Sequence, residues 1–330
     1  MVKKLQSEIR RKLLAAFSEA DGGYVSGQKI SELLGCSRTA VWKHIEELRK
    51  EGFVLEAVRR KGYRIVKTPE KITANEIQLG LQTDFIGQNI VYYDTVDSTQ
   101  KIAHELSQKG AEEGTLVVAD EQTGGRGRMA RVWYSPKGTG IWMSIILRPN
   151  IPLQKTPQLT LLTAVALVEG IEEATGLSPT IKWPNDILIN GKKAVGILTE
   201  LEAEADQVHS VIIGIGINVN QQIDEFPEAI RNTATSIAIE KGEKIHRALI
   251  IQKFLERFEK WYTTYLEHGF KPIKLLWESY SISLNKTIHA RTLSGTVVGK
   301  ALGINEEGAL LIETSEGKIE KVYSADIDIK

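Results

Sequence analysis

Apolar residues recur every three or four positions in three short segments at the start of the chain. They are LQSEIRRKLLAAF, the stretch after Ser26 with apolar Ile30, Leu33 and Leu34, and SRTAVWKHIEELRKEG, and this spacing predicts amphipathic helices. Ser26 and Ser37 can cap the second and third helices, and Gly52 ends the third. Two strand-like runs follow, FVLEAV and YRIV, joined by the basic turn RRKG. The pattern predicts a helix, a turn, a helix and then a hairpin.

Farther along the chain, predicted strands interleave with predicted helices. KTPE, at 67–70, is typical of a short linker. Strands are predicted at NIVYYDTV, TLVVADEQ, GIWMSIIL and HSVIIGIGINVN, and the pair Asn190-Gly191 indicates a hairpin within ILINGKKAVGILTEL. Helices are predicted at ITANEIQLGL, DSTQKIAHEL, residues 156–175 and HRALIIQKFLERFEKWYTTYLEHG. Because hairpins occur among these elements, we expect a mixed or antiparallel α+β sheet.

The last fifty or so residues alternate short β runs with glycine-containing turns, which predicts a small β-barrel. We therefore expect a multi-domain α+β protein with three parts. A winged helix-turn-helix domain would span 1–66, a central mixed-sheet α/β domain 67–275, and the β-barrel 276–330. A length of 330 residues suits two or three domains.

The composition, 42% hydrophobic and 25% charged, is typical of a soluble globular protein. The single cysteine, Cys36, cannot form an internal disulfide, which favours a reducing compartment. No apolar run approaches the roughly 18 residues that a membrane span needs. The N-terminus also lacks the apolar core of a signal peptide. We expect a cytoplasmic protein without a membrane partner.

The net charge of zero conceals an asymmetry between the two ends of the chain. Residues 1–66 hold 14 Lys and Arg against 8 Asp and Glu, whereas the remainder holds 28 against 34. Five cations and one threonine could face DNA from the third predicted helix and the hairpin turn. They are Arg38, Thr39, Lys43, Arg59, Arg60 and Lys61. A solvated helix beside a basic turn would contain the same residue types. The helix, turn, helix and basic wing together favour DNA binding and resemble the winged helix-turn-helix domains of bacterial regulators.

The stretch GGRGRMARVW, at 124–133, combines three glycines with three arginines. GRGRMA fits the dinucleotide pattern G-x-G-x-x-A, but VWYSPKGTG follows it where that motif requires a helix. No G-x-x-x-x-G-K-[ST] loop occurs in the chain. A loop of backbone amides and guanidinium groups can nevertheless enclose phosphates. The alternative is a flexible basic surface loop.

Four other strings carry candidate chemistry, each with an ordinary alternative. In KWPND, Asn185 suits a base or phosphate and Asp186 a metal or guanidinium, although Pro-Asn-Asp is also common in turns. Lys193 is either a cation aimed into a pocket or a charge that protects a strand edge. Gly214 and Gly216 leave a strand bare, either for a ligand or for close backbone packing. Ser98 and Thr99, in DSTQ, can simply cap a helix.

Taken in order, DSTQ, EQTGGRGR with a tryptophan beyond it, KWPND, KKAVGIL and GIGIN resemble the biotin–protein ligases over about residues 72–325. With the N-terminal module, the chain resembles the bifunctional bacterial type, which is both a ligase and a repressor of biotin synthesis. The resemblance implies a class II synthetase-like central domain and an SH3-like C-terminal barrel.

The resemblance also implies a two-step reaction. Biotin's carboxylate attacks the α-phosphate of ATP, pyrophosphate leaves, and biotinyl-5′-AMP stays bound. A lysine of a biotin carboxyl carrier domain then displaces AMP. Biotin and ATP are thus expected substrates, Mg²⁺ an expected cofactor, and the carrier domain and operator DNA expected partners. We also expect a homodimer once the adenylate is bound.

Residue roles follow from the matched motifs. The implied catalytic residues are Lys193, Arg126 and Arg128, which would also contact biotin. The other implied biotin-binding residues are Ser98, Thr99, Gln100, Gln122, Gly127, Gly214 and Gly216. Those implied at the nucleotide are Gly125, Arg131, Trp133, Asn185 and Asn218. No metal ligand is assigned, and Asp186 is the candidate for that role or for the base that deprotonates the acceptor lysine.

The glycine–arginine loop departs from the family pattern at one place. The family string often reads GRGRRGR, whereas Met129 and Ala130 stand here. This change removes a charge and some backbone freedom, which bears on lid closure and adenylate retention. The alternatives to a bifunctional protein are a ligase without DNA binding, a lipoate–protein ligase and a non-catalytic sensor.

Overall fold

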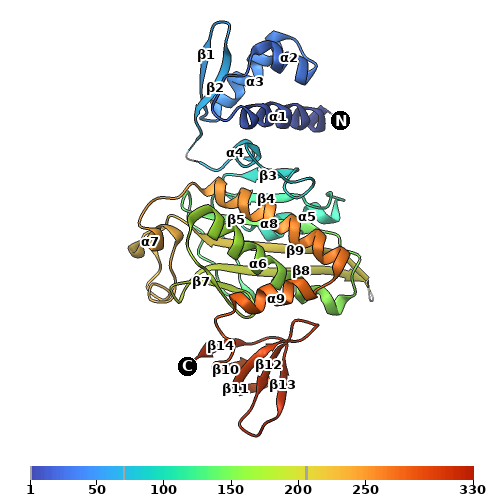
Figure 1. The fold of residues 1–330 in the computed structure, drawn as a ribbon, viewed down its shortest axis with the longest axis vertical. Coiled ribbons are helices and arrows are strands. Elements are labelled where there is room, and N and C mark those ends of the chain that lie inside the picture. The colour runs from blue at the N-terminus through green and yellow to red at the C-terminus, as the bar shows by residue number, and fades with distance from the viewer. Residues whose placement is uncertain (1, 70, 205–206) are drawn as a thin grey trace. The chain divides into compact units, whose positions relative to one another are not determined.

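The computed structural model describes residues 2–69, 71–204 and 207–330, which form two compact units that divide after Gln82 (Figure 1). The first unit contains the predicted helix-turn-helix and hairpin. Its elements are α1 (Val2–Glu19), α2 (Gly27–Leu34), α3 (Arg38–Lys50), β1 (Val54–Val58), β2 (Gly62–Lys67) and α4 (Ala74–Gln78).

The caps predicted for α2 and α3 are confirmed. The side chains of Ser26 and Ser37 accept hydrogen bonds from the backbone N–H groups of Lys29 and Ala40. Gly52 adopts a φ of 99° just after α3, a conformation that glycine reaches without steric cost. The apolar faces of these elements meet in one buried cluster, whose members include Leu13, Phe17, Ile30, Val41, Ile45, Leu48 and Leu55.

Helix α4 extends this unit past the expected linker. Thr73 caps it by accepting a hydrogen bond from the backbone N–H of Glu76. Ile72 and Ile77 are buried, and α4 contacts α1. Glu70, the last residue of the expected linker, lies outside the described residues.

The second unit is built on a seven-stranded sheet in the order β3-β4-β5-β9-β8-β7-β6. Its strands are β3 (Ile90–Tyr93), β4 (Leu116–Ala119), β5 (Gly140–Leu147), β6 (Thr180–Lys182), β7 (Asp186–Ile189), β8 (Lys192–Glu204) and β9 (Gln207–Asn218). Strands β3 and β4 are parallel, and the other neighbours are antiparallel. The predicted mixed sheet is therefore confirmed.

Helices cover both faces of this sheet. They are α5 (Thr99–Gln108), α6 (Thr156–Thr175), α7 (Ile237–Lys241), α8 (Arg247–His268) and α9 (Lys271–Tyr280), with short 3₁₀ turns at Arg128–Ala130, Leu153–Lys155 and Ile223–Glu225. Successive residues of a strand point to opposite faces. On β8, Thr199 hydrogen-bonds Thr160 of α6, whereas the next residue, Glu200, contacts His104 of α5. Helices α5 and α6 therefore lie on opposite faces.

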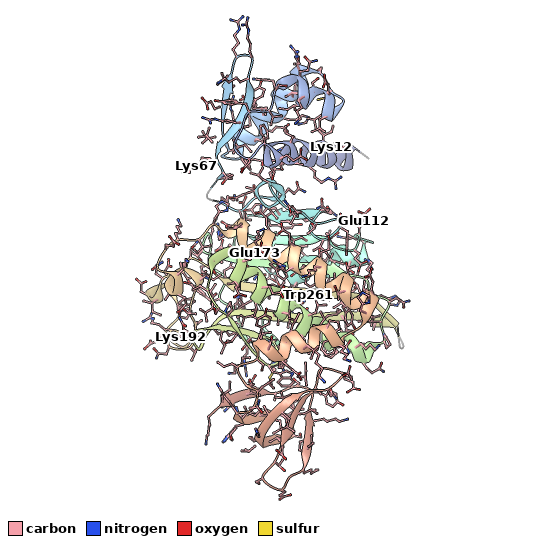
Figure 2. The ribbon with its side chains drawn as sticks, in the orientation of Figure 1. Lys12, Lys67, Glu112, Glu173, Lys192 and Trp261 are labelled. Carbon is pink, nitrogen blue, oxygen red and sulfur yellow. The ribbon has the colours of Figure 1, made fainter. Side chains whose placement is uncertain are left out.

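Helices α6 and α8 are joined by polar contacts, and Figure 2 labels two of the residues that make them, Glu173 of α6 and Trp261 of α8. The Nε1 of Trp261 on α8 donates to a carboxylate oxygen of Glu169 on α6 at 2.8 Å. Arg257, also on α8, donates to Glu173 at 2.7 Å. These contacts link α8 to α6, which packs against one face of the sheet.

The C-terminal segment forms a separate five-stranded antiparallel sheet in the order β13-β12-β11-β10-β14. Its strands are β10 (Thr287–Thr292), β11 (Gly295–Ile304), β12 (Leu310–Glu313), β13 (Ile319–Val322) and β14 (Asp326–Ile329). The predicted small β domain is confirmed. Across the described residues, no helix combines the length and apolar character that crossing a membrane requires.

Candidate functional site

A cavity of about 460 Å³ lies in the second unit, against strands β8 and β9. It brings together side chains from the start of α5, the glycine–arginine loop, the hairpin β7–β8 and the end of β9. The predicted site residues that line it are Ser98, Thr99, Gln100, Gln122, Arg126, Gly127, Arg128, Arg131, Trp133, Asn185, Asp186, Lys193, Gly214, Gly216 and Asn218. Motifs spread over about 120 residues of sequence thus converge on one space.

A buried polar network lies at the start of α5. The Thr99 hydroxyl is 3.1 Å from Oε1 of Gln122 and 2.9 Å from the Ser144 hydroxyl. Ser144 also donates to Oε1 of Gln100 at 2.9 Å. Ser98 occupies the N-cap position of α5 but makes no capping hydrogen bond with its side chain. Helix capping by the Ser98 side chain therefore does not explain the DSTQ string, of which Ser98, Thr99 and Gln100 line the cavity.

Two side chains cover the bare glycines of β9. A Cβ atom at Gly214 would lie 2.6 Å from Oε1 of Gln100, and one at Gly216 would lie 2.2 Å from Nε1 of Trp133. The Trp133 ring also lies against Gly196 of β8. These glycines are thus required by close side-chain packing, which the sequence alternatives did not include. The Nε1 of Trp133 is buried without a hydrogen-bond partner, so the indole gives up no hydrogen bond if it moves.

The glycine–arginine loop folds back on itself as a narrow hairpin. The N–H of Gly127 donates to the carbonyl of Arg131 at 2.8 Å, and a Cβ at Gly125 would lie 2.5 Å from the carbonyl oxygen of Trp133. At the tip, Met129 and Ala130 adopt φ values of 55° and 56°. Such left-handed conformations cost about 1 kcal/mol for a residue other than glycine. Glycine in place of Ala130, as in the family string GRGRRGR, would avoid that cost at this position.

Side chains of the C-terminal sheet hold this loop. Arg128 donates to the Asn185 side chain at 3.1 Å and to the Ser324 hydroxyl at 2.5 Å. Arg131 forms an ion pair with Asp326 of β14, and this hydrogen bond lowers the pKa of the Asp326 carboxyl. The sequence analysis did not identify Ser324 or Asp326, because no local pattern marks a contact across nearly 200 residues.

Lys193 lies inside the site rather than at an open strand edge. Its strand pairs with β7 on one side, and its backbone N–H donates to the carbonyl of Thr233 at 2.8 Å. The Nζ atom is 2.6 Å from Oδ1 of Asp186 and 5.2 Å from the centre of the Trp133 ring. Lys193 therefore fits the interpretation as a cation aimed into a pocket, and not that as a charge protecting a strand edge. Asp186 is engaged by this cation.

Two asparagines also line the cavity. Asn185 donates to the carbonyl of Ile197 at 2.8 Å, and Asn218 donates to that of Thr235 at 3.0 Å. Phe226 and Ile230, which follow β9, add apolar lining that the motifs did not predict. The cavity therefore combines the polar network at the start of α5 with cationic side chains, two asparagines and apolar lining.

The residues predicted to face DNA lie on the surface of the first unit. On α3, Arg38, Thr39 and Lys43 are exposed, and Trp42 between them is 53% exposed. The turn between β1 and β2 carries the three exposed cations Arg59, Arg60 and Lys61. An exposed tryptophan on this face was not predicted, because the helical period alone does not distinguish it from a partly buried position.

Known protein families match three parts of the chain. Residues 92–218 match the Biotin/lipoate A/B protein ligase family, residues 9–64 an HTH domain, and residues 283–330 the Biotin protein ligase C terminal domain.

Whole-chain relatives and solved structures agree with these matches. The chain is 63% identical to the Bifunctional ligase/repressor BirA of Bacillus subtilis (strain 168), covering 98% of this chain and 100% of the relative. It is 28% identical to the protein of that name from Escherichia coli (strain K12), over 94% of each. The biotin protein ligase from Aquifex aeolicus in complex with biotin and ATP is 34% identical, with a TM-score of 0.64, over 73% of this chain and 98% of that one.

Proposed function

Because this chain belongs to the bifunctional biotin protein ligases that carry an N-terminal helix-turn-helix domain, we propose how its cleft forms and retains an acyl-adenylate. The protein is an ATP-dependent biotin–protein ligase and a DNA-binding repressor. The observation that carries the proposal is the single cavity in which Lys193 and the loop arginines meet the polar network of α5. The chain is 63% identical to a bifunctional biotin ligase, and this similarity removes the lipoate–protein ligase as an alternative.

The first half-reaction brings two anions together. Biotin's carboxylate attacks the α-phosphate of ATP, and the bond to pyrophosphate breaks. Lys193 would leave Asp186 and bridge the carboxyl and phosphate oxygens, while Arg126 and Arg128 hold the same junction. Cations fixed in advance reduce the repulsion and stabilise the negative charge on the oxygens around the reacting phosphorus.

The lining of the cavity suits the two halves of the adenylate. Ser98, Thr99, Gln100 and Gln122 offer donors and acceptors for biotin's ureido ring. Space over Gly214 and Gly216 opens when the Gln100 and Trp133 side chains shift. Asn185, Asn218 and the displaced Trp133 would then contact the nucleotide, with Gly125, Gly127 and Arg131 shaping the loop above it. Closure of that loop keeps water from the mixed anhydride until the carrier lysine attacks it and AMP leaves.

Loss of the Asp326 carboxylate is expected to weaken retention of the adenylate. Asp326→Ala removes the ion pair that holds Arg131, so the loop should open more often and release biotinyl-5′-AMP about tenfold faster. A filter-binding chase of labelled adenylate measures this rate. Asp328→Ala is the matched control, since Asp328 lies on the same strand and pairs with Arg291 instead. Equal release from the two variants would contradict the role given to Asp326.

Mg²⁺ is proposed to enter with the phosphates of ATP. Among the described residues, no group of three or more His, Cys, Asp or Glu is placed to hold a metal ion. Mg²⁺ is commonly bound by one or two carboxylates together with substrate phosphates. Asp186 is the carboxylate that could meet it there.

We also propose that the adenylate promotes pairing of two chains, so that two helix-turn-helix domains meet a two-fold operator. Helix-turn-helix proteins commonly read two half-sites as dimers. We propose three domains for this protein, 1–66, 67–275 and 276–330, and a cytoplasmic location. Sedimentation at about micromolar protein should show dimers with biotin and ATP together, and monomers with either alone. Monomers under all conditions would contradict the proposal.

Transfer to the acceptor tests the ligase as a whole. The protein is incubated with ATP, labelled biotin and a biotin carboxyl carrier domain, with labelled lipoate in a parallel reaction. Label on the carrier lysine from biotin, and none from lipoate, is expected. Transfer from lipoate alone, or from neither compound, would refute the assignment.

A further inference from the structure

Trp183 belongs to the KWPND string and lies in the turn between β6 and β7. Its side chain is buried, and its Nε1 donates to the carbonyl of Gly308 at 3.2 Å. Gly308 lies between β11 and β12 of the C-terminal sheet. The indole N–H thus joins the central sheet to the C-terminal sheet across 125 residues of sequence.

The turn that accepts this hydrogen bond is held in shape by its own residues. The side-chain oxygen of Asn305 accepts the backbone N–H groups of Glu307 and Ala309 at 3.1 and 2.8 Å. Gly308 has a φ of 83°, and a Cβ there would lie 2.8 Å from Cδ1 of Leu161 on α6. The turn therefore fits closely against α6 and leaves no room for a side chain at Gly308.

A second buried contact holds the same turn on the helical layer. The Nε2 of Gln158 on α6 donates to the carbonyl of Glu306 at 2.5 Å, and its Oε1 accepts the hydroxyl of Tyr265 on α8, also at 2.5 Å. Buried polar groups are costly to leave unpaired, so these contacts and that of Trp183 favour one position of the turn. Residues 305–309 are called the docked turn.

The docked turn leads directly to a side chain that holds the glycine–arginine loop. Leu310, the next residue, begins β12 and pairs with Val322 of β13. Ser324 lies two residues after Val322, and its hydroxyl accepts a hydrogen bond from Arg128. A shift of the docked turn is therefore passed through one β pair to the residue that holds Arg128.

Arg128 is held at two points, and both are connected to Trp183. It donates to Asn185, two residues after Trp183, at 3.1 Å, and to Ser324, at the end of the path through Gly308, at 2.5 Å. A guanidinium has more N–H donors than these two contacts use, so others remain for substrate oxygens. Charged groups act most strongly on a transition state when they are fixed before the reaction begins.

We propose that Trp183 is a positioning residue of the ligase, whose indole N–H keeps the docked turn and Ser324 where they fix Arg128. This inference rests on the role proposed for Arg128 at the carboxylate–phosphate junction. The indole suits this task because its ring fills a buried position while its N–H reaches the other sheet.

Trp183→Phe tests the proposal, because phenylalanine keeps a buried ring but has no N–H. Formation of labelled biotinyl-5′-AMP is followed in a single turnover of the full-length protein, with urea unfolding as a check on the fold. The limiting rate should fall about tenfold, because a displaced charge stabilises the transition state less well. The biotin concentration that gives half of that rate should change by less than about twofold, since the ureido ring meets the polar network of α5.

Trp261→Phe is the matched control. It also removes an indole N–H hydrogen bond within the second unit, but that bond joins α8 to Glu169 of α6 and not to the C-terminal sheet. This variant should keep the limiting rate of the wild type.

A double-variant cycle with Arg128 separates positioning from a general loosening of the protein. Arg128→Ala alone should slow adenylate formation about a hundredfold. If Trp183 acts through Arg128, adding Trp183→Phe to Arg128→Ala should slow the reaction by less than about twofold further. Independent effects would multiply instead, and the further loss would be the full tenfold or about that.

Gly308→Ala moves the docked turn without changing Trp183, which tests the proposal even if Trp183→Phe folds poorly. The added Cβ would meet Leu161, so the limiting rate should fall about tenfold, again only while Arg128 is present. Gly317→Ala is its control, since Gly317 has a φ of 75° in the same sheet but nothing within 4 Å of an added Cβ. It carries a similar backbone strain and should keep the wild-type rate.

Two results would overturn the inference: wild-type limiting rates in Trp183→Phe and Gly308→Ala, or a full further loss when Trp183→Phe is added to Arg128→Ala. A wild-type protein that forms no adenylate with biotin, or an Arg128→Ala variant with the wild-type rate, would instead refute the proposed function. The two failures are therefore distinguishable.

Discussion

Lys193→Ala is expected to slow formation of biotinyl-5′-AMP about a thousandfold without unfolding the protein. The ammonium group belongs to the lining of the cavity and lies 2.6 Å from Asp186, where substrate oxygens can replace that carboxylate. Losing a preorganised charge at the reacting phosphate typically costs between a hundredfold and a thousandfold in rate. The loss of Lys193 also leaves Asp186 as an added negative charge beside the incoming anions, which places the expected effect at the upper end.

Pre-steady-state formation of the adenylate measures this rate, and urea unfolding monitors the fold. The free energy of unfolding should change by about 1 kcal/mol or less, because both partners retain access to solvent. Lys192→Ala is the matched control, since Lys192 is the preceding residue of the same strand and is exposed (Figure 2). A Lys193→Ala variant that turns over like Lys192→Ala would refute the catalytic role.

Removing the basic turn of the hairpin is expected to weaken DNA binding about a hundredfold. The triple variant Arg59→Ala, Arg60→Ala and Lys61→Ala deletes three exposed cations at the wing. Each cation that neutralises a phosphate releases a counterion. The negative slope of log affinity against log salt should therefore become smaller in magnitude by about three. Ligase activity should be unchanged, because the wing belongs to the first compact unit and the cavity to the second.

Affinity is measured with a duplex enriched from random sequence by the wild-type protein, in the presence of biotin and ATP. A second triple variant, with alanine at Lys109, Lys137 and Lys241, removes the same charge from exposed positions of the other unit. It should keep both the affinity and the salt slope. Equal losses in the two triple variants would indicate a general charge effect and remove the wing from the DNA interface.

Local patterns were sufficient for most elements and for the residues that line the cavity. Helical spacing and serine caps predicted α2 and α3, and the Asn190-Gly191 pair predicted the β7–β8 hairpin. The order of five motifs predicted which side chains belong together. Such signals are contained in a few neighbouring residues, so they do not depend on knowing the tertiary fold.

What the sequence could not predict depends on contacts between distant segments. Asp326 meets Arg131 only because the C-terminal sheet lies against the loop, and no periodicity encodes that approach. The sequence implied a nucleotide contact for Trp133 but not that its ring would cover Gly216. His104 has the spacing of an ordinary helix surface, and its contact with Glu200 exists only because β8 places that residue opposite it. Packing of this kind is decided by tertiary structure.

The cleft is proposed to join biotin to the α-phosphate of ATP. The most direct measurement uses ATP labelled at the α-phosphorus, incubated with biotin and the protein without a carrier, followed by chromatography of the bound products. We expect label in a protein-bound compound that contains both biotin and AMP, formed only when biotin is present and largely absent with Lys193→Ala. Label that stays in ATP, or an adenylate that forms equally well in the Lys193→Ala variant, would contradict it.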